Sequence, residues 1–227
     1  MGIHSGVDII ENGLVACLDG ANFKSYTQTG TAWTDVSLTG NNGILQNNPT
    51  FSSLNGGNFS LDGTDDRVLI NCAASTIRLF DSSIQFVIRL PLYSGGQRCI
   101  LSYRSGSGGG NLYIGKGSGG IFCYYNELNN PGYTVGSITD NTIAHCVVTC
   151  DATNNTLSTY INGTLAGSAT RTGWVSGYNT RFYLGWDEGG TNEYMLGNLY
   201  YFSHYNRVLT AAEVLQNFNA LRGRFVL

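Results

Sequence analysis

Residues 143–170, IAHCVVTCDATNNTLSTYINGTLAGSAT, hold short strand-like runs separated by turn residues. The runs are IAHCVVTCD, TLSTYI and LAGSAT, and such runs punctuated by Asn, Gly and Asp are typical of successive antiparallel strands. Asn162 and Gly163, between the second and third runs, tolerate the positive φ that tight hairpin turns require. The stretch therefore predicts a meander of antiparallel strands.

Similar runs recur along most of the 227 residues, in a composition with Gly 31, Tyr 14 and Phe 10 that suits a sheet protein with glycine-rich turns. The runs that we interpret as strands are 14–19, 58–63, 67–72, 83–92, 98–104, 111–116, 120–127, 143–151, 156–163, 181–186 and 196–206. So many strands exceed one open sheet and favour two packed layers. We therefore expect an all-β fold, a two-sheet antiparallel sandwich over residues 12–227, with residues 1–11 as an N-terminal arm or an edge strand.

One helix is predicted near the C-terminus, in LTAAEVLQNFNALRG, residues 209–223. Thr210 as N-cap and Glu213 three residues later form a capping box, and Gly223 is expected to end the helix. The apolar side chains at helical spacing, expected to face the sandwich, are Val214, Leu215, Phe218 and Leu221.

The charge pattern argues against nucleic acid as a partner. The net charge is −3, and with Lys24 and Lys116 as the only lysines there is no basic stripe to neutralise a row of phosphates. No run approaches the roughly 20 apolar residues that span a bilayer, and MGIHSGVDIIENG lacks the features of a signal peptide. We expect no association with a membrane, and we expect the chain to be synthesised in a cytoplasm without a signal for export.

Most of the six cysteines lie inside apolar runs. Cys146 and Cys150 fall on one side of a strand about 13 Å apart, at ~3.3 Å per residue, so they cannot bridge each other. We expect reduced, buried cysteines.

These segments resemble the laminin G-like, concanavalin A-like domains, and more narrowly those in virion structural proteins of tailed bacteriophages, notably marine and cyanobacterial ones. The resemblance is carried by NGLVACLDGANFKSY (12–26), WTDVSLTGNNG (33–43), NFSLDGTDDRVLI (58–70), IAHCVVTCDATNNTLSTYINGTLAG (143–167) and LGNLYYFSHYNRVLTAAEVLQNF (196–218).

The resemblance implies a jelly-roll sandwich and a non-enzymatic virion structural protein. Such a protein decorates the phage head or forms a fibre module on the virion surface, and contacts host-surface glycans. A soluble carbohydrate-binding lectin is the alternative. A glycan hydrolase is disfavoured, because no predicted strand carries the paired carboxylates that glycoside hydrolysis uses.

Asp62, Asp65 and Asp66 form an acidic turn in FSLDGTDDRVLI, residues 59–70. We interpret them as structural, with Gly63 allowing the turn and the aspartates accepting backbone N–H groups. Calcium ligation is the alternative interpretation.

A second acidic loop, LGWDEGGTNEYMLGN, resembles in position the calcium loop of pentraxins. The resemblance implies Asp187 and Glu188 as Ca²⁺ ligands, while the loop that would complete the site offers Asn111 and no carboxylate. A solvated acidic loop without metal is the other interpretation.

Aromatic residues in turns suggest a glycan-binding rim, because sugars are held by flat apolar faces and a few polar groups. Trp33 is expected in the core. The predicted rim consists of Trp174, Tyr178, Trp186, Asp187 and Asn192.

Attachment to a particle would use the N-terminal arm. Its apolar residues, predicted as the assembly contact, are Ile3, Val7, Ile9 and Ile10. The expected partners are other virion proteins, of capsid or tail, and further copies of the chain as a homo-oligomer.

Overall fold

The computed structural model describes residues 7–72, 77, 80–93, 98–105, 109–117, 120–125, 133–134, 136–172, 181–188, 193–225 and 227. For residues 104, 105, 109–111, 122–125, 133 and 134 only the backbone is described.

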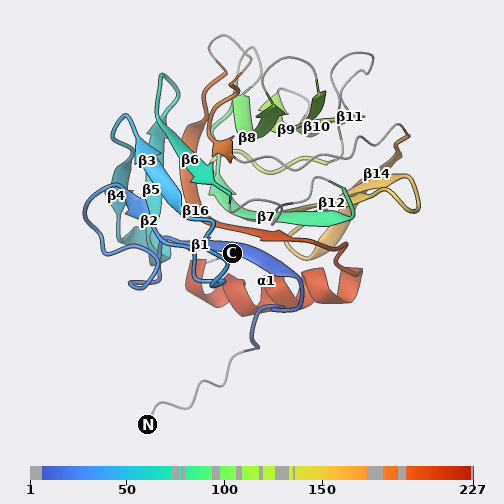
Figure 1. Ribbon diagram of the computed structural model, residues 1–227, viewed down its shortest axis with the longest axis horizontal. Helices are drawn as coiled ribbons and strands as arrows, with labels where there is room; N and C mark the ends of the chain where they lie inside the picture. Colours follow the sequence, from blue (N-terminus) through green and yellow to red (C-terminus); the bar gives the residue numbers. More distant parts are fainter. Residues whose placement is uncertain are drawn as a thin grey trace.

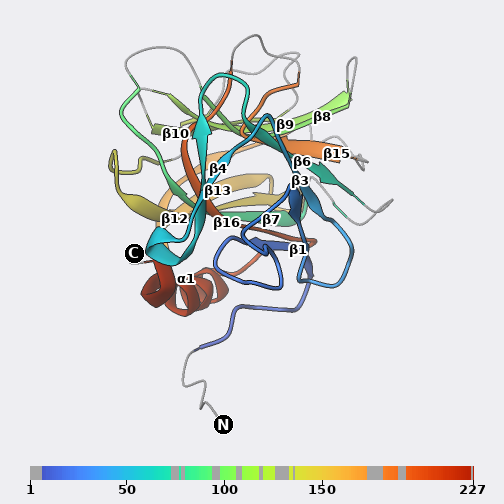
Figure 2. The ribbon, with the colours of Figure 1, turned by 90° about the vertical axis from the view of Figure 1, so that its left-hand side faces the viewer.

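The described strands form two antiparallel sheets that pack face to face (Figures 1 and 2). The first sheet runs β14 (Thr164–Thr170), β13 (Thr156–Ile161), β12 (Ile143–Asp151), β7 (Ser82–Arg89), β16 (Leu196–Tyr205), β5 (Asn58–Asp62) and β4 (Thr50–Ser52), with β1 (Leu14–Asp19) also paired to β16. The second sheet runs β11 (Tyr133–Thr134), β10 (Gly120–Tyr125), β9 (Gly109–Gly117), β8 (Arg98–Ser105), β15 (Arg181–Leu184), β6 (Arg67–Asn71), β3 (Gly43–Gln46) and β2 (Ala32–Trp33). A 3₁₀ turn, η1 (Leu54–Gly56), and one α-helix, α1 (Ala211–Phe225), complete the described elements. The predicted all-β jelly-roll sandwich with a C-terminal helix is confirmed.

Each predicted strand run overlaps one observed strand, and the short strands β2, β3, β4 and β11 were not predicted. Strands of two to four residues are too short to show alternation in the sequence. They exist because a long neighbour supplies the hydrogen-bonding partner, as β6 does for β3.

The predicted hairpin between β13 and β14 is confirmed. Asn162 and Gly163 have φ of 50° and 80°, the left-handed conformation of a two-residue hairpin turn. Ile161 pairs directly with Thr164 across the turn.

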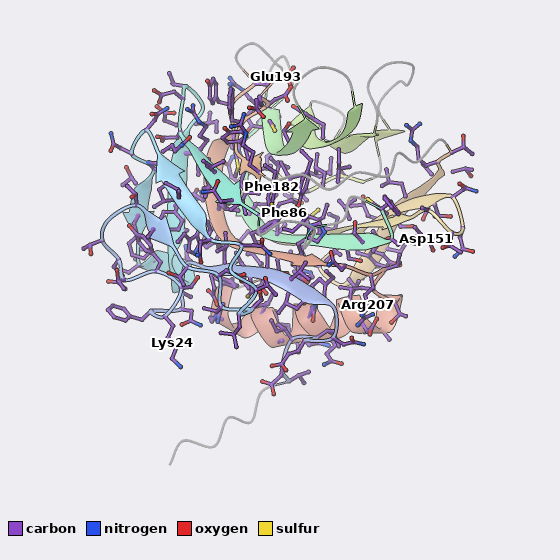
Figure 3. All side chains as sticks on the ribbon, in the orientation of Figure 1. Lys24, Phe86, Asp151, Phe182, Glu193 and Arg207 are labelled. Atoms are coloured by element: carbon purple, nitrogen blue, oxygen red, sulfur yellow. The ribbon has the colours of Figure 1, made fainter. Side chains whose placement is uncertain are left out.

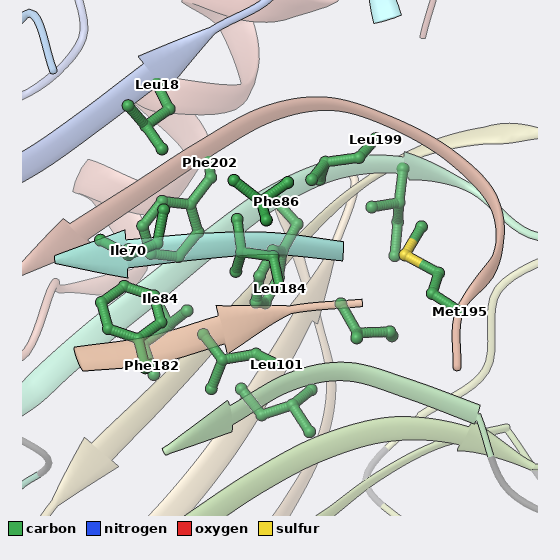
Figure 4. Packing of buried hydrophobic residues seen from close by; sticks show 14 of the residues in the cluster. Leu18, Ile70, Ile84, Phe86, Leu101, Phe182, Leu184, Met195, Leu199 and Phe202 are labelled. Atoms are coloured by element: carbon green, nitrogen blue, oxygen red, sulfur yellow. The ribbon is translucent and has the colours of Figure 1, made fainter. Parts of the chain in front are cut away.

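Aromatic rings from both sheets meet in the core (Figure 4). Phe182 of β15 stacks on Tyr103 with centroids 4.2 Å apart and contacts Phe202 of β16 at 5.6 Å. Phe202 in turn lies 5.7 Å from Phe86 of β7, and Trp33 is fully buried as predicted. Each such side chain contributes about 1.5–3 kcal/mol of hydrophobic stabilisation.

Helix α1 lies across the side of the first sheet that faces away from the second sheet (Figure 1). Its capping box is confirmed, because Glu213 N–H donates to Thr210 Oγ1 and Thr210 N–H donates to Glu213 Oε2. Arg207 also pairs with Glu213 and holds the pKa of that carboxyl at about 2, helped by the Thr210 hydrogen bonds.

The predicted end of this helix was wrong, and the predicted face was right only in part, since Val214 and Leu221 are buried as expected. Gly223 does not end α1, which continues to Phe225, a buried ring in contact with Tyr200 and Tyr201. Contacts of Phe225 with the sheet offset the low helix propensity of Gly223. The buried helix residues are Val214, Asn217, Leu221 and Phe225, whereas Leu215 is 46% exposed. Asn217 was missed because it is polar, but it bonds to Gln85 and Tyr205 beneath the helix.

The cysteines with described side chains are Cys17, Cys72, Cys99, Cys146 and Cys150, and all five carry thiols rather than disulfide bonds. Burial raises the pKa of both Cys146 and Cys150 to about 12. The predicted reduced state of these five is confirmed, and the side chain of Cys123 lies outside the described part.

Residues 7–11 form an arm rather than an edge strand. Ile10 N–H donates to Asn217 Oδ1 at 2.8 Å, and Gln216 Nε2 donates to the Asp8 carbonyl at 3.0 Å. Ile9 and Ile10 are partly buried against the chain's own core, while Val7 is 55% exposed. Ile3, from the predicted assembly contact, lies outside the described residues.

No helix among the described residues has both the length and the apolar character to cross a bilayer.

Candidate functional site

The side of the second sheet that faces away from α1 carries the candidate site. Along β6 and β15 the residues Val68, Ile70, Phe182 and Leu184 point into the core, so the alternate residues point outward. Cross-strand pairing then places Ile44, Leu69 and Tyr183 in one row. We call this surface the outer face, and it comprises Ile44, Gln46, Arg67, Leu69, Arg181, Tyr183, Trp186 and Tyr194. In Figure 3, Glu193, next to Tyr194 in the chain, lies on the opposite side of the molecule from Arg207 beside α1.

Trp186 is held at the centre of an aromatic group on the outer face. Its ring packs edge-on against Tyr183, with centroids 4.7 Å apart, and nearly parallel to Tyr194 at 6.1 Å. The chain reaches this position through Gly185, with φ of 85°, where a Cβ would meet Leu61 Cδ2 at 2.4 Å. Glycine is therefore required immediately before the tryptophan.

Arg67 lies over the Trp186 ring, with its guanidinium carbon 4.6 Å from the ring centroid. Its Nε donates to Gln46 Oε1 at 2.8 Å, and Nη1 makes a long 3.4 Å bond to the Asp65 carbonyl. Stacking and hydrogen bonding together fix a cation on the half-buried aromatic surface.

Asp187 and Glu188, predicted to face a ligand, are both engaged within the chain. Asp187 is 1% exposed and accepts a hydrogen bond from Ser102 Oγ at 2.9 Å. Glu188 forms an ion pair with Arg181. A hard cation needs several converging oxygens. These two carboxylates therefore have partners within the chain, and calcium ligation by them stays a prediction.

The acidic turn between β5 and β6 has the structural role that we expected. Asp62 Oδ1 accepts the N–H groups of Thr64 and Asp65, and the Thr64 bond is the main cause of a lowered pKa at Asp62. Asp66 Oδ2 accepts the Asp62 N–H, and burial raises the pKa of Asp66. Oxygens of Asp62, Asp65 and Asp66 lie within 4.8 Å of one another, and the turn's own amides account for the positions of the Asp62 and Asp66 carboxylates.

Of the predicted glycan rim, Trp186 and Asp187 are described, while Trp174, Tyr178 and Asn192 lie outside the described residues. Asn111 belongs to β9, and its side chain lies outside the described part. Sequence reasoning missed Arg67, Tyr183 and Tyr194. The alternation in RVLIN and RFYL could have placed Arg67 and Tyr183 on one surface, but the pairing of β6 with β15 was not known.

The protein is an antiparallel β-sandwich in which a helix covers one sheet. The other sheet presents aromatic and cationic side chains on the outer face. Residues 62–215 match a laminin G family model described as the concanavalin A-like lectin/glucanases superfamily, so the chain belongs to that superfamily. No curated protein matches the chain in sequence.

Solved structures of similar fold include both binding domains and an enzyme. The binding domain of Paraclostridial Mosquitocidal Protein 1 is similar at a TM-score of 0.72 and 17% identity, over 92% of this chain and 52% of that one. The ligand-binding domain of botulinum neurotoxin serotype D, solved with N-acetylneuraminic acid, gives 0.71 and 16%, over 92% and 51%. The Trypanosoma rangeli sialidase gives 0.68 and 17%, over 94% of this chain and 33% of that one. This chain thus spans between a third and about half of these proteins, and the likeness establishes the fold.

Proposed function

We propose that the chain is a non-enzymatic carbohydrate-binding module that contacts glycans through its outer face. The observation that carries this proposal is the half-buried Trp186 ring, with Arg67 over it and the partly exposed Ile44 and Leu69 nearby. Tyr183, which is 7% exposed, supports the Trp186 ring from its edge. Apolar and aromatic surface next to a few fixed polar groups suits the alternating apolar and hydroxyl surfaces of a sugar.

The carboxylates of the described outer face support binding rather than hydrolysis. Glycoside hydrolysis uses two carboxyl groups facing the scissile bond. Here the Asp187 carboxylate is buried against Ser102 and the Glu188 carboxylate pairs with Arg181. Neither carboxylate is positioned to act as an acid or a nucleophile on a surface ligand.

The finer part of the proposal is that this module works on the virion surface of a tailed phage, as a head decoration or fibre module for host adhesion. The five segments that resemble virion laminin G-like domains support this placement. We take residues 12–227 as the binding unit and residues 1–11 as the arm, with the exposed Val7 available to a neighbouring virion protein or copy.

A glycan array followed by titration calorimetry tests the binding function. Trp186→Ala should lower affinity for the best glycan by about 5- to 150-fold, because one aromatic contact contributes about 1–3 kcal/mol in stacking sites. Phe23→Ala is the matched control, since Phe23 is an aromatic residue 67% exposed outside the outer face. Binding that survives Trp186→Ala unchanged would contradict the proposed site.

The virion placement needs a separate experiment. Light scattering on the purified chain, with pull-downs against purified phage capsid and tail proteins, should detect an oligomer or co-assembly. A monomer without such a partner would favour the soluble lectin.

A further inference from the structure

We infer that the outer face selects sugars that carry a carboxylate, and that Arg67 is the residue that binds this carboxylate. The inference rests on the proposed glycan-binding function and adds the substrate class. Sialic acids and uronic acids share the required chemistry.

The guanidinium of Arg67 is positioned before any ligand arrives. Trp186 supports its flat face at 4.6 Å, and Gln46 Oε1 accepts from Nε at 2.8 Å. These contacts leave the Nη2 edge and part of Nη1 for a ligand, because the single bond at Nη1 is long, at 3.4 Å. A planar guanidinium held in this way loses little entropy when it binds a carboxylate with two parallel hydrogen bonds.

The partners of Arg67 among the described residues are all uncharged, unlike those of three other arginines. Arg181, Arg207 and Arg224 each pair with a carboxylate of the chain. Arg67 instead contacts an amide oxygen, a backbone carbonyl and an aromatic ring. Its positive charge therefore remains available for a ligand.

The surroundings of Arg67 specify an anionic sugar rather than a small anion. An apolar surface lies next to Arg67 and its cross-strand neighbour Gln46. It consists of Ile44, which is 37% exposed, and the half-buried Leu69. An apolar surface of this kind contacts the ring carbons of a sugar while the guanidinium binds its carboxylate.

The acidic turn next to Arg67 repels such a ligand, but the repulsion by Asp62 is reduced. The Asp62 carboxylate accepts the amides of Thr64 and Asp65, so these dipoles partly compensate its charge. Asp65 is exposed and its carbonyl contacts Arg67. Asp65→Asn should therefore raise affinity for a carboxylated sugar modestly, about 2- to 5-fold, as expected for removing a like charge near the surface.

Calorimetry on the full chain tests the inference with three probes: a sialylated lactose, a uronic acid oligosaccharide and lactose. The methyl ester of each acidic probe keeps the sugar and removes the charge. We expect the wild-type chain to bind at least one acidic probe 10- to 100-fold more tightly than its ester, the range for hydrogen bonds to charged groups. Which acid binds identifies the source of the carboxylate.

Variants at Arg67 then separate charge from geometry. Arg67→Met should abolish the preference for acid over ester, and Arg67→Lys should retain only part of it, because lysine keeps the charge without the planar fork. Arg89→Lys is the matched control, since Arg89 lies in the first sheet with its Nε bonded to the Asn141 carbonyl. Melting curves of every variant verify that it folds.

Different results would overturn the proposed glycan-binding function and the inferred preference for a carboxylate. If no glycan binds, the proposed function and the inference both fail. If lactose or the esters bind as tightly as the acids, or if Arg67→Met keeps the acid preference, the inference is overturned while glycan binding stands.

Discussion

The first sheet carries α1 across its outer side, whereas the second sheet presents Ile44, Arg67 and Trp186 on its outer face. Under the helix, Phe225 packs on Tyr200 and Tyr201, and Asn217 bonds to groups of two strands and the arm. On the outer face the corresponding contacts are made among a few side chains, and one edge of the Arg67 guanidinium has no partner among the described residues.

This difference separates the surface that stabilises the fold from the surface available to a ligand. Burial of apolar area beneath α1 contributes to stability, whereas fixed but incompletely satisfied groups contribute to recognition. Substitutions on the two sides should therefore affect unfolding and binding in opposite proportion.

The largest effect on stability is expected beneath the helix. Phe225→Ala should lower the free energy of unfolding by about 3–5 kcal/mol, because it empties a fully buried ring site. Denaturant unfolding measures the loss. Leu215→Ala on the exposed side of α1 is the control and should change stability by less than about 0.5 kcal/mol. Equal losses of unfolding free energy for both variants would mean that α1 does not stabilise the fold by covering the first sheet.

A pH effect should also originate on the covered side. His145 is fully buried near Phe218, neither ring nitrogen has a hydrogen-bond partner among the described residues, and burial lowers its pKa to about 3. The unfolded chain takes up this proton below about pH 6.5, whereas the folded chain does not until about pH 3. Above pH 6.5 neutral His145 therefore costs the fold nothing, and the free energy of unfolding falls as the pH drops from 6.5 toward 3.

The expected loss from His145 between pH 7 and pH 5 is about 2 kcal/mol. Chemical unfolding at both pH values measures it, and His145→Leu should remove most of the difference. A variant that keeps the full pH dependence would assign the effect to other groups.

The start of α1 should give a smaller effect. Glu213→Gln weakens the pair with Arg207 and the capping box, and should lower stability by about 1 kcal/mol at neutral pH. Because the folded pKa of Glu213 is about 2, against an ordinary value of 4.5, its contribution is present above pH 4.5 and is lost toward pH 2. The melting temperature should change less with pH over this range in Glu213→Gln than in the wild-type chain. Glu11→Gln, at an exposed glutamate, should keep the pH dependence of the wild-type chain.

The smallest effect on stability is expected on the outer face. Ile44→Ala should cost less than about 1 kcal/mol, because Ile44 is 37% exposed, yet it should weaken glycan binding. Denaturant unfolding and binding calorimetry on the same preparation compare the change in stability with the change in glycan affinity. A large loss of stability with unchanged binding would reverse the roles that we assign to the two sides.

Much of this architecture could be predicted because it depends on local chemistry. The hairpin at Asn162 and Gly163 follows from their tolerance of positive φ, and the Thr210–Glu213 box from a spacing of three residues. The acidic turn at Asp62 likewise satisfies its own amides. Each of these features needs only residues that are close in the chain.

The candidate site could be predicted only in part. Trp186 stood out as an aromatic residue in a loop, but Asp187 in the same loop is buried against Ser102, 85 residues away in the chain. Arg67 reaches Trp186 only because β6 pairs with β15. The end of α1 depended in the same way on a distant contact, that of Phe225 with β16.

Local chemistry along the chain set the strand-forming runs, their turns and the start of the helix, and with them the resemblance to a sandwich family, since propensity and short-range hydrogen bonding act over a few residues. Only the tertiary structure decided which side of each sheet is covered, where α1 ends and which cation stacks on Trp186. These features depend on strand register and on contacts between distant segments, and a shift of one residue in register would move every side chain of a strand to the other side of its sheet.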